Sequence, residues 1–234
     1  MIRGLLFDKD GTLLDFDATW RGFALEVLEA LAPGDPALRA RLGEAVGVDA
    51  ATGAFAPGSP IVAGTSADIA EIWAPMLPGW SVASLTAEAD RRALAATARG
   101  PAPAAPDLPG LLDRLAAPGR RLGIATHDGE AAARAHMLSL GALDRFDFVA
   151  GYDSGHGLKP GPGMVQAFCA AQGLAPQEVA MIGDSLHDLH AGRAAGMRTI
   201  GVLTGPALRA ELEPAADVVL DHIGEIPGWL DQTA

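Results

Sequence analysis

Residues 2–12 read IRGLLFDKDGT, and this stretch shows the pattern that decides the fold class. Ile2 to Phe7 is a short, largely apolar run, typical of a buried strand, and it stops at Asp8, Asp10 and Gly11. Three later segments have the same form, an apolar run followed by polar residues or glycine: Arg121 to Ala125, Glu178 to Ile182 and Thr199 to Leu203. The chain therefore predicts several short strands that end in polar loops.

Helix-like stretches separate the later strands, at Glu130 to Leu140, Met164 to Gln172 and Leu186 to Ala195. Alternation of strand and helix predicts a parallel sheet covered by helices on both faces, that is, an α/β, doubly wound (Rossmann-like) core. Ligands of such sheets bind beyond the carboxyl ends of the strands. The polar residues predicted at those ends are Asp8, Asp10, Thr126 and Asp184.

Residues 18–99 break this alternation. They contain helix-like patterns and no convincing strand, at Trp20 to Leu31, Pro36 to Val46, Ala67 to Met76 and Ala87 to Ala98. The segment Gly100 to Pro106 is rich in proline, which suits a semi-rigid linker. We therefore expect a core domain of residues 1–17 and 101–234, interrupted by an α-helical subdomain at residues 18–100.

The charge of the chain limits its partners. The formal net charge is −12, and among the 17 basic residues there are two lysines, Lys9 and Lys159. This composition argues against a nucleic-acid surface, and it requires a bound cation or a focused positive charge wherever an anionic substrate binds. No stretch of about 18 apolar residues is free of charge or proline, so we expect no membrane association and a cytoplasmic location. The single cysteine, Cys169, is expected to be a small buried hydrophobe.

Asp8 and Asp10 are two residues apart at a predicted strand end, where alternation points both carboxylates to the same side. Two adjacent carboxylates repel each other unless a cation or a shared proton intervenes, so one can stay ionised while the other is protonated. A nucleophile and a general acid fit that division. An ordinary Asp-Gly turn with a second, exposed Asp is the alternative.

Asp184 ends another predicted strand, and Asp188 follows one turn later. Mg²⁺ prefers a few carboxylates together with water and substrate oxygens, so Asp8, Asp184 and a loop carbonyl could hold this ion. Asp188 also matches a helix-capping pattern that starts at Ser185. We therefore expect Asp184 to be the better candidate for a direct metal ligand, although Asp188 can serve both roles.

Lys159 and Thr126 are the candidates for binding a phosphate group. Lys159 precedes a proline, which places it in the loop from Gly155 to Gly163, and it is the natural charge partner for phosphate in a chain with so few lysines. Thr126 could offer its hydroxyl and neighbouring N–H groups to a phosphoryl oxygen. The alternatives are a solvated surface lysine and a helix-capping threonine.

In this order, the residues resemble the four motifs of the haloacid dehalogenase superfamily of phosphohydrolases. The motifs are Asp8-Lys9-Asp10-Gly11-Thr12, then Thr126, then Lys159, and then Gly183-Asp184 with Asp188. The first and last are specific signatures, whereas the threonine and the lysine gain meaning from their positions between them. The resemblance covers the whole core, and the helical insertion resembles the cap that this family places just after its first motif.

The resemblance implies a role for each matched residue. Asp8 would attack phosphorus, and Asp10 would protonate the leaving alcohol and then activate water to hydrolyse the aspartyl-phosphate. Mg²⁺ would be bound by Asp8, Asp184 and the carbonyl of Asp10, with Asp188 supporting the site. The predicted phosphate-binding set is Thr126, Lys159, Gly11, Thr12 and His127. His127 stands where relatives often have Asn, so it either contacts substrate from the rim of the site or makes only structural hydrogen bonds.

The resemblance leaves several activities to weigh. Asp10 favours phosphoryl transfer over dehalogenation, because a halide leaves without protonation, and the insertion holds no lysine for a phosphonoacetaldehyde hydrolase. A sugar-phosphate mutase is an alternative, since it differs mainly in whether the aspartyl-phosphate meets water or a second hydroxyl. A phospho-accepting receiver domain is disfavoured by the insertion of about 80 residues. We expect a phosphatase for a small phosphorylated metabolite, with 2-phosphoglycolate as the leading candidate from the resemblance to phosphoglycolate phosphatase-like members.

Overall fold

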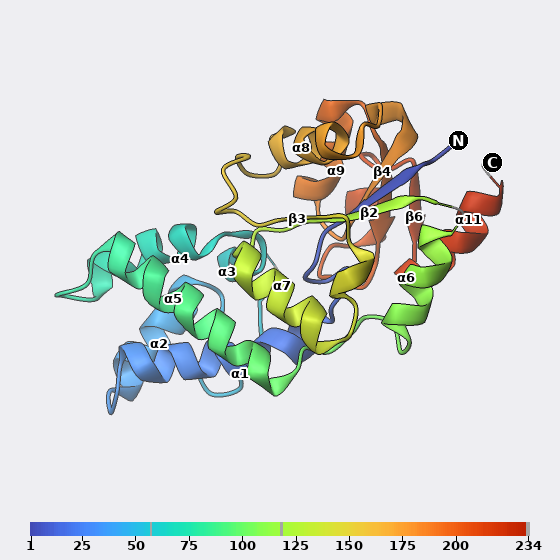
Figure 1. Ribbon diagram of the computed structural model, residues 1–234. Helices are drawn as coiled ribbons and strands as arrows, with labels where there is room; N and C mark the ends of the chain where they lie inside the picture. Colours follow the sequence, from blue (N-terminus) through green and yellow to red (C-terminus); the bar gives the residue numbers. More distant parts are fainter. Residues whose placement is uncertain (57, 118, 233–234) are drawn as a thin grey trace. The chain divides into compact units, whose positions relative to one another are not determined.

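The computed structural model describes residues 1–56, 58–117 and 119–232, and the chain folds as two compact units (Figure 1). The first unit consists of Met1–Asp15 and the chain from Pro101 onward, and the second is Phe16–Gly100. The first unit is α/β and the second is helical. Among the described residues, no helix combines the length and the hydropathy that spanning a bilayer requires.

A six-stranded sheet forms the centre of the first unit. Its strands are β1 (Gly4–Phe7), β2 (Arg121–Ala125), β3 (Phe148–Ala150), β4 (Val179–Gly183), β5 (Arg198–Val202) and β6 (Val218–Leu220). The spatial order is β3-β2-β1-β4-β5-β6, and every neighbouring pair is parallel. This topology confirms the predicted doubly wound core. The strand order reverses next to β1, and ligands of such sheets bind at the carboxyl ends of the strands at this reversal.

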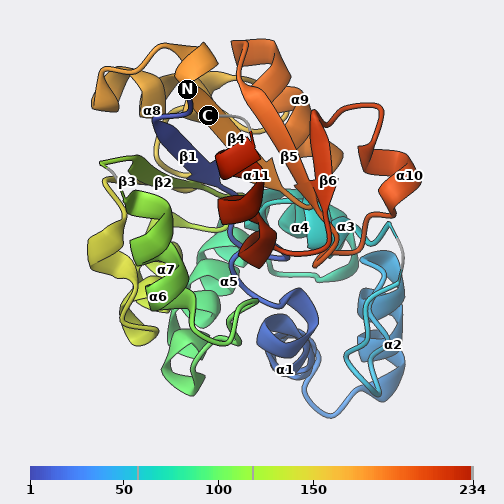
Figure 2. The ribbon, with the colours of Figure 1, turned by 90° about the vertical axis from the view of Figure 1, so that its right-hand side faces the viewer.

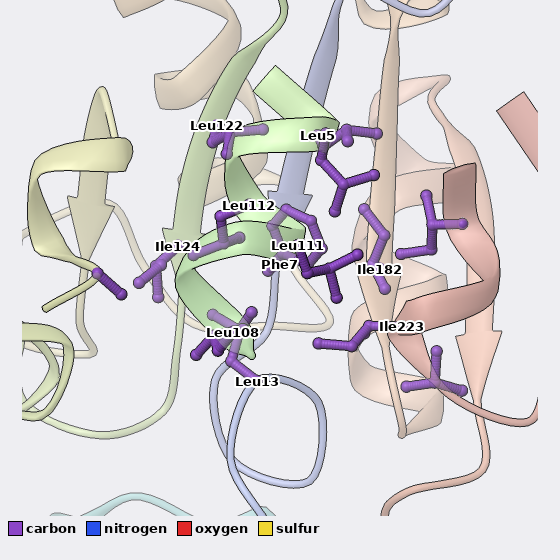
Figure 3. Packing of buried hydrophobic residues seen from close by; sticks show 14 of the residues in the cluster. Leu5, Phe7, Leu13, Leu108, Leu111, Leu112, Leu122, Ile124, Ile182 and Ile223 are labelled. Atoms are coloured by element: carbon purple, nitrogen blue, oxygen red, sulfur yellow. The ribbon is translucent and has the colours of Figure 1, made fainter. Parts of the chain in front are cut away.

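Helices cover both faces of the sheet (Figure 2). They are α6 (Leu108–Ala116), α7 (Glu130–Ser139), α8 (Gly163–Gln172), α9 (Leu186–Ala195), α10 (Arg209–Leu212) and α11 (Ile226–Gln232). Leu5 and Phe7 of β1 belong to one buried cluster with residues of α6, α7 and α11, whereas Leu6 belongs to another with residues of α8 and α9. Figure 3 shows the first cluster, in which Leu111 and Leu112 of α6 lie near Phe7 and Leu108 of the same helix lies near Leu13. Because β1 is buried on both faces, the residues that follow it start from a fixed position.

Single residues set the ends of the covering helices. Asp107 begins α6 by accepting the N–H of Gly110 at 3.0 Å. α8 and α9 end at Gly173 and Gly196, which adopt left-handed φ values of 63° and 80° that suit glycine. Cys169 lies buried on α8, as predicted.

The second unit contains the helices α1 (Phe16–Leu31), α2 (Pro36–Ala45), α3 (Pro60–Ala63), α4 (Ser66–Trp73) and α5 (Val82–Ala96). It has a buried cluster of its own, formed by apolar residues of α1, α2, α4 and α5 together with the segments that join them. The Nε1–H of Trp73 donates to the carbonyl oxygen of Leu42 at 2.9 Å, which satisfies the buried indole and connects α4 with α2. Helical packing alone therefore gives this unit its core.

Candidate active site

Three carboxylates converge beyond the carboxyl ends of β1 and β4. Asp8 follows the last residue of β1, Asp184 follows the last residue of β4, and Asp188 lies in the first turn of α9. Each offers a carboxylate oxygen, and these oxygens lie within 4.8 Å of one another in a buried group. The convergence follows from the topology, because β1 and β4 are parallel neighbours that end at the same edge of the sheet.

Lys159 supplies positive charge to this group. Its Nζ lies 2.6 Å from Oδ1 of Asp8 and 2.6 Å from Oδ1 of Asp188, and it donates to the carbonyl oxygen of Ala125 at 2.8 Å. Burial disfavours the ammonium form, but Asp188 and Asp8 outweigh burial, so the pKa of Lys159 is raised above its ordinary value. Lys159 is therefore a cation in contact with the predicted nucleophile.

The carboxylates carry more negative charge than this one lysine offsets. Burial, together with Asp188 and Asp10, raises the pKa of Asp8 to about 7 against the opposing effect of Lys159. Burial, together with Asp8 and Asp188, also raises the pKa of Asp184 well above its ordinary value. Oxygen ligands with surplus negative charge are what Mg²⁺ requires, so the donor set fits this ion.

Asp188 makes the helix-capping contacts that its sequence position predicts, and it also contacts Lys159. Its Oδ1 contacts Lys159, while its Oδ2 accepts the backbone N–H of Ser185 at 3.1 Å and the hydroxyl of Ser185 at 2.6 Å. The second pair of contacts is the return half of a capping box at the start of α9. The helix end therefore fixes the carboxylate that contacts Lys159.

Two glycine-containing loops enclose Asp184. Gly11 has φ +83°, a conformation that favours glycine, and a Cβ at this position would lie 2.7 Å from the carboxyl carbon of Asp184. Thr12 donates its hydroxyl to Oδ1 of Asp184 at 3.3 Å. From the loop after β5, a Cβ at Gly205 would also collide with this carboxylate, and Thr204 donates its hydroxyl to the carbonyl oxygen of Gly11 at 2.6 Å. Gly11 and Thr12, predicted to bind phosphate, thus lie against Asp184, and sequence reasoning missed Thr204 and Gly205.

Thr126 and His127 follow β2, the other neighbour of β1. Thr126 is buried, and its hydroxyl oxygen accepts the N–H of Asp128 at 3.0 Å, which closes a short turn. The ring of His127 packs edge-on against the ring of His187, with centroids 5.6 Å apart. Because His187 precedes Asp188, this ring contact joins the loop after β2 to the start of α9.

Asp10 contacts Lys9, the other lysine of the chain, to which sequence reasoning gave no role. Lys9 is fully buried, and its Nζ lies 2.7 Å from Oδ1 and 2.6 Å from Oδ2 of Asp10. The same Nζ lies 3.1 Å from Oδ2 of Asp128 and 3.4 Å from Nδ1 of His136 on α7. Burial disfavours the charge of Lys9, but Asp10 and Asp128 outweigh it and raise the pKa of this lysine. The sequence signal was the rarity of lysine and its place between two acidic residues.

Comparison with known proteins identifies the family of this chain. A family model described as haloacid dehalogenase-like hydrolase matches residues 2–196. The chain is 32% identical over 120 residues to the phosphoglycolate phosphatase of Rhodospirillum rubrum, a match that covers 51% of this chain and 50% of that protein. It is 28% identical over 233 residues to the phosphoglycolate phosphatase of Yersinia pseudotuberculosis, which covers 96% of this chain and 91% of that protein. The matches thus span about half the length of several curated relatives and nearly all of others.

The fold is also shared with a solved structure. The crystal structure of CbbY from Rhodobacter sphaeroides in complex with phosphate matches with a TM-score of 0.73 at 23% identity, covering 97% of this chain and 96% of that one. This likeness concerns the fold, whereas the family model concerns the sequence of most of the chain. The chain belongs to the haloacid dehalogenase-like hydrolase family.

Proposed function

We propose that this protein is a magnesium-dependent phosphate-monoester hydrolase that acts through an aspartyl-phosphate on Asp8. One observation carries the proposal: the buried carboxylates of Asp8, Asp184 and Asp188 meet within 4.8 Å around the ammonium group of Lys159. A nucleophilic carboxylate, a fixed cation and a donor set for Mg²⁺ are the parts that phosphoryl transfer requires. Family membership and the names of the curated relatives support the same activity.

The chemistry divides into two transfers at phosphorus. In the first, a carboxylate oxygen of Asp8 forms a bond to phosphorus, the ester P–O bond breaks, and Asp10 gives a proton to the leaving alkoxide. In the second, Asp10 takes a proton from water, the water oxygen bonds to phosphorus, and the bond to Asp8 breaks. Inorganic phosphate leaves, and both aspartates return to their starting states.

The other residues of the site bind and neutralise the phosphoryl group. Lys159 and the turn of Thr126 would hold its oxygens, with Gly11, Thr12 and His127 completing the predicted set. Mg²⁺ held by Asp8, Asp184 and the carbonyl of Asp10, with Asp188 in support, would offset the charge on these oxygens. Gly11 and Thr12 would act mainly through Asp184, since the hydroxyl of Thr12 already donates to it.

We further propose that the helical unit Phe16–Gly100 is the cap that sets substrate choice, and that 2-phosphoglycolate is the first ester to test. The support is the position of the insertion after the first motif and the name of the curated relatives. We prefer the hydrolase over the mutase because the matching family is described as a hydrolase family and these curated relatives are named phosphatases. Membership of a hydrolase family speaks against the receiver-domain alternative.

Phosphate release tests the proposal. Wild-type protein with Mg²⁺ is incubated with p-nitrophenyl phosphate and a panel of small phosphate esters that includes 2-phosphoglycolate. EDTA and Asp8→Asn should each abolish release, whereas Asp113→Asn, a change at an exposed carboxylate on α6, should not. Release that survives Asp8→Asn would refute the aspartyl-phosphate. A wild-type chain that takes label from acetyl phosphate at Asp8 but releases phosphate from no ester would point to a mutase or a phospho-accepting protein.

A further inference from the structure

The ammonium group of Lys9 lies inside the first unit. It contacts its sequence neighbour Asp10 and two side chains from distant segments, Asp128 and His136. It contacts both carboxylate oxygens of Asp10, at 2.7 and 2.6 Å, and Lys9 has no exposed surface. The proposed function uses Asp10 as the group that moves protons and gives Lys9 no task. We propose that Lys9 is a positioning residue that holds the Asp10 carboxylate in the orientation for proton transfer, an inference that rests on the proposed function.

Lys9 also contacts two groups from segments distant in the sequence. Oδ2 of Asp128, in the loop after β2, lies 3.1 Å from Nζ, and Nδ1 of His136, in the last turn of α7, lies 3.4 Å from it. An ammonium group has three N–H donors, and four acceptor atoms from Asp10, Asp128 and His136 lie around it. The contact with Asp10 is therefore part of a fixed network and not a flexible surface pair.

The network is tied to the phosphate side of the site. Oδ1 of Asp128 accepts the N–H of Gly129 at 2.8 Å, and the N–H of Asp128 donates to the hydroxyl oxygen of Thr126 at 3.0 Å. The turn that presents Thr126 thus also holds the anchor of Lys9. Loss of the Lys9 side chain removes the contact with Asp10 directly, whereas the bond from the backbone N–H of Asp128 to Thr126 does not involve Lys9.

A fully buried lysine costs free energy that an apolar residue of similar size would avoid. We infer that this charge is retained because its contact with Asp10 orients the Asp10 carboxylate. Proton transfer requires the acid within hydrogen-bond reach of the leaving oxygen, and a misplacement of about 1 Å can cost about 10²-fold in rate. The two lysines of the chain then have parallel tasks, since Lys159 contacts the nucleophile Asp8 and Lys9 contacts the acid–base residue Asp10.

The test compares esters whose leaving groups differ in their need for a proton. p-Nitrophenolate leaves without protonation, whereas an alkoxide needs the proton of Asp10. For Lys9→Met, we expect kcat/KM for an alkyl phosphate to fall about 10- to 100-fold and kcat/KM for p-nitrophenyl phosphate to change by less than about threefold. kcat/KM is the right quantity, because it reports the steps up to release of the alcohol and excludes the later attack of water.

Two controls separate positioning from folding. Met137→Ala removes a fully buried neighbour of His136 on α7 without removing a polar contact, and it should lower stability while leaving the ratio between the two esters unchanged. In the Asp10→Asn background, Lys9→Met should add no more than about a twofold loss for the alkyl ester, because residues that act as one unit are not additive. The cycle of these variants therefore measures whether Lys9 acts through Asp10.

The outcomes are distinct. Equal losses on both esters, or a full further loss in the Asp10→Asn background, would overturn the positioning role. If Lys9→Met does not fold, Asp128→Asn keeps Lys9 and loosens its anchor, and it should show the same selective loss for the alkyl ester at smaller size. A wild-type protein that releases phosphate from neither ester would instead overturn the proposed function itself.

Discussion

The lysines and arginines of this protein differ in where they lie. Lys9 and Lys159 are buried and contact the proposed catalytic carboxylates, whereas arginine ion pairs such as Arg145–Asp113 and Arg198–Asp217 lie at the surface. Exposed pairs of this kind contribute about 0–1 kcal/mol and are screened by salt. Lysine is a compact point charge on a flexible chain, which suits contact with several carboxylate oxygens at once. We therefore assign the functional charge to the two lysines.

His136 should make stability depend on pH. Burial, together with the nearby Lys9 ammonium, lowers the pKa of His136 to about 4, although Asp10 opposes the shift. The carboxylate of Asp128 also faces this ring, with its Oδ2 3.9 Å from Nδ1, while Nζ of Lys9 is 3.4 Å from the same atom. Unfolded histidine titrates near 6.5, so between about pH 6.5 and pH 4 the unfolded chain binds the extra proton and stability falls as pH falls.

The expected size of this loss is about 3 kcal/mol between pH 7 and pH 4. Urea unfolding of wild type and His136→Gln at both pH values isolates it, since the other titrating groups are common to both proteins. Wild type should lose about 3 kcal/mol more than the variant. An equal loss in the two proteins would show that His136 is accessible to protons in the folded state.

Substitution of Gly11 tests whether the loop after β1 fixes the position of Asp184. Gly11 (φ +83°) and Gly155 (φ +80°) have similar backbone conformations, but a Cβ at Gly11 would collide with Asp184, while one at Gly155 would meet no atom within 4 Å. Both changes to alanine should cost about 1–2 kcal/mol from the backbone. Gly11→Ala should also displace Asp184 and weaken Mg²⁺ binding about 10- to 100-fold, measured by calorimetric titration. Equal Mg²⁺ affinities in the two variants would mean that the loop does not fix Asp184.

The sequence predicted the central elements better than the edges of the sheet. β2 and α9 occupy the predicted residues, because apolar runs and polar breaks coincide there. β3 (FVA) and β6 (VVL) are apolar but have three residues each, which is too short for a sequence pattern to identify a strand. α6 was overlooked after the proline-rich segment, although its leucines at 108, 111, 112 and 115 follow helical spacing and Asp107 caps it.

The same distinction applies to the site. Asp8 and Asp184 could be brought together from the sequence, because parallel strands end at one edge of the sheet. The contact between Lys9 and His136 could not, since the two are 127 positions apart and His136 lies in the last turn of a helix, away from any strand end. The position of a strand end predicts where the backbone lies. It does not predict where a long lysine side chain points, because that depends on the tertiary packing around it.

At the scale of the whole molecule, each buried apolar cluster belongs to one unit. Leu42 is fully buried in the cluster of the second unit, and Leu112 is fully buried in a cluster of the first. Each change to alanine should cost about 2–5 kcal/mol. We expect Leu42→Ala to speed amide hydrogen exchange in α1, α2 and α4 and to leave β1 and β4 protected, with the reverse pattern for Leu112→Ala. Faster exchange throughout the chain in both variants would show that the units unfold together.

Mg²⁺ should stabilise the folded state of this chain, whose net charge is −12. Three buried carboxylates against one ammonium leave a local surplus of negative charge, and Mg²⁺ that binds only the folded state should stabilise it by about 3 kcal/mol at 100 times its Kd. Thermal unfolding with Mg²⁺ or EDTA measures this difference. Asp184→Asn should lose most of the stabilisation, while Asp113→Asn, with its change at an exposed site, should keep it.

Protons and Mg²⁺ compete for the same carboxylates, so the stabilisation by Mg²⁺ should also depend on pH. Because burial is the main cause that raises the pKa of Asp8 to about 7, this carboxyl binds a proton in the metal-free protein below neutral pH, and burial shifts the pKa of Asp184 in the same direction. Mg²⁺ must displace those protons, so its stabilising effect should be larger at pH 8 than at pH 6. Asp184→Asn should show little Mg²⁺ effect at either pH. A wild-type effect of equal size at both values would mean that Mg²⁺ binds surface carboxylates instead, since exposed carboxylates are ionised at both pH values and offer no protons to displace.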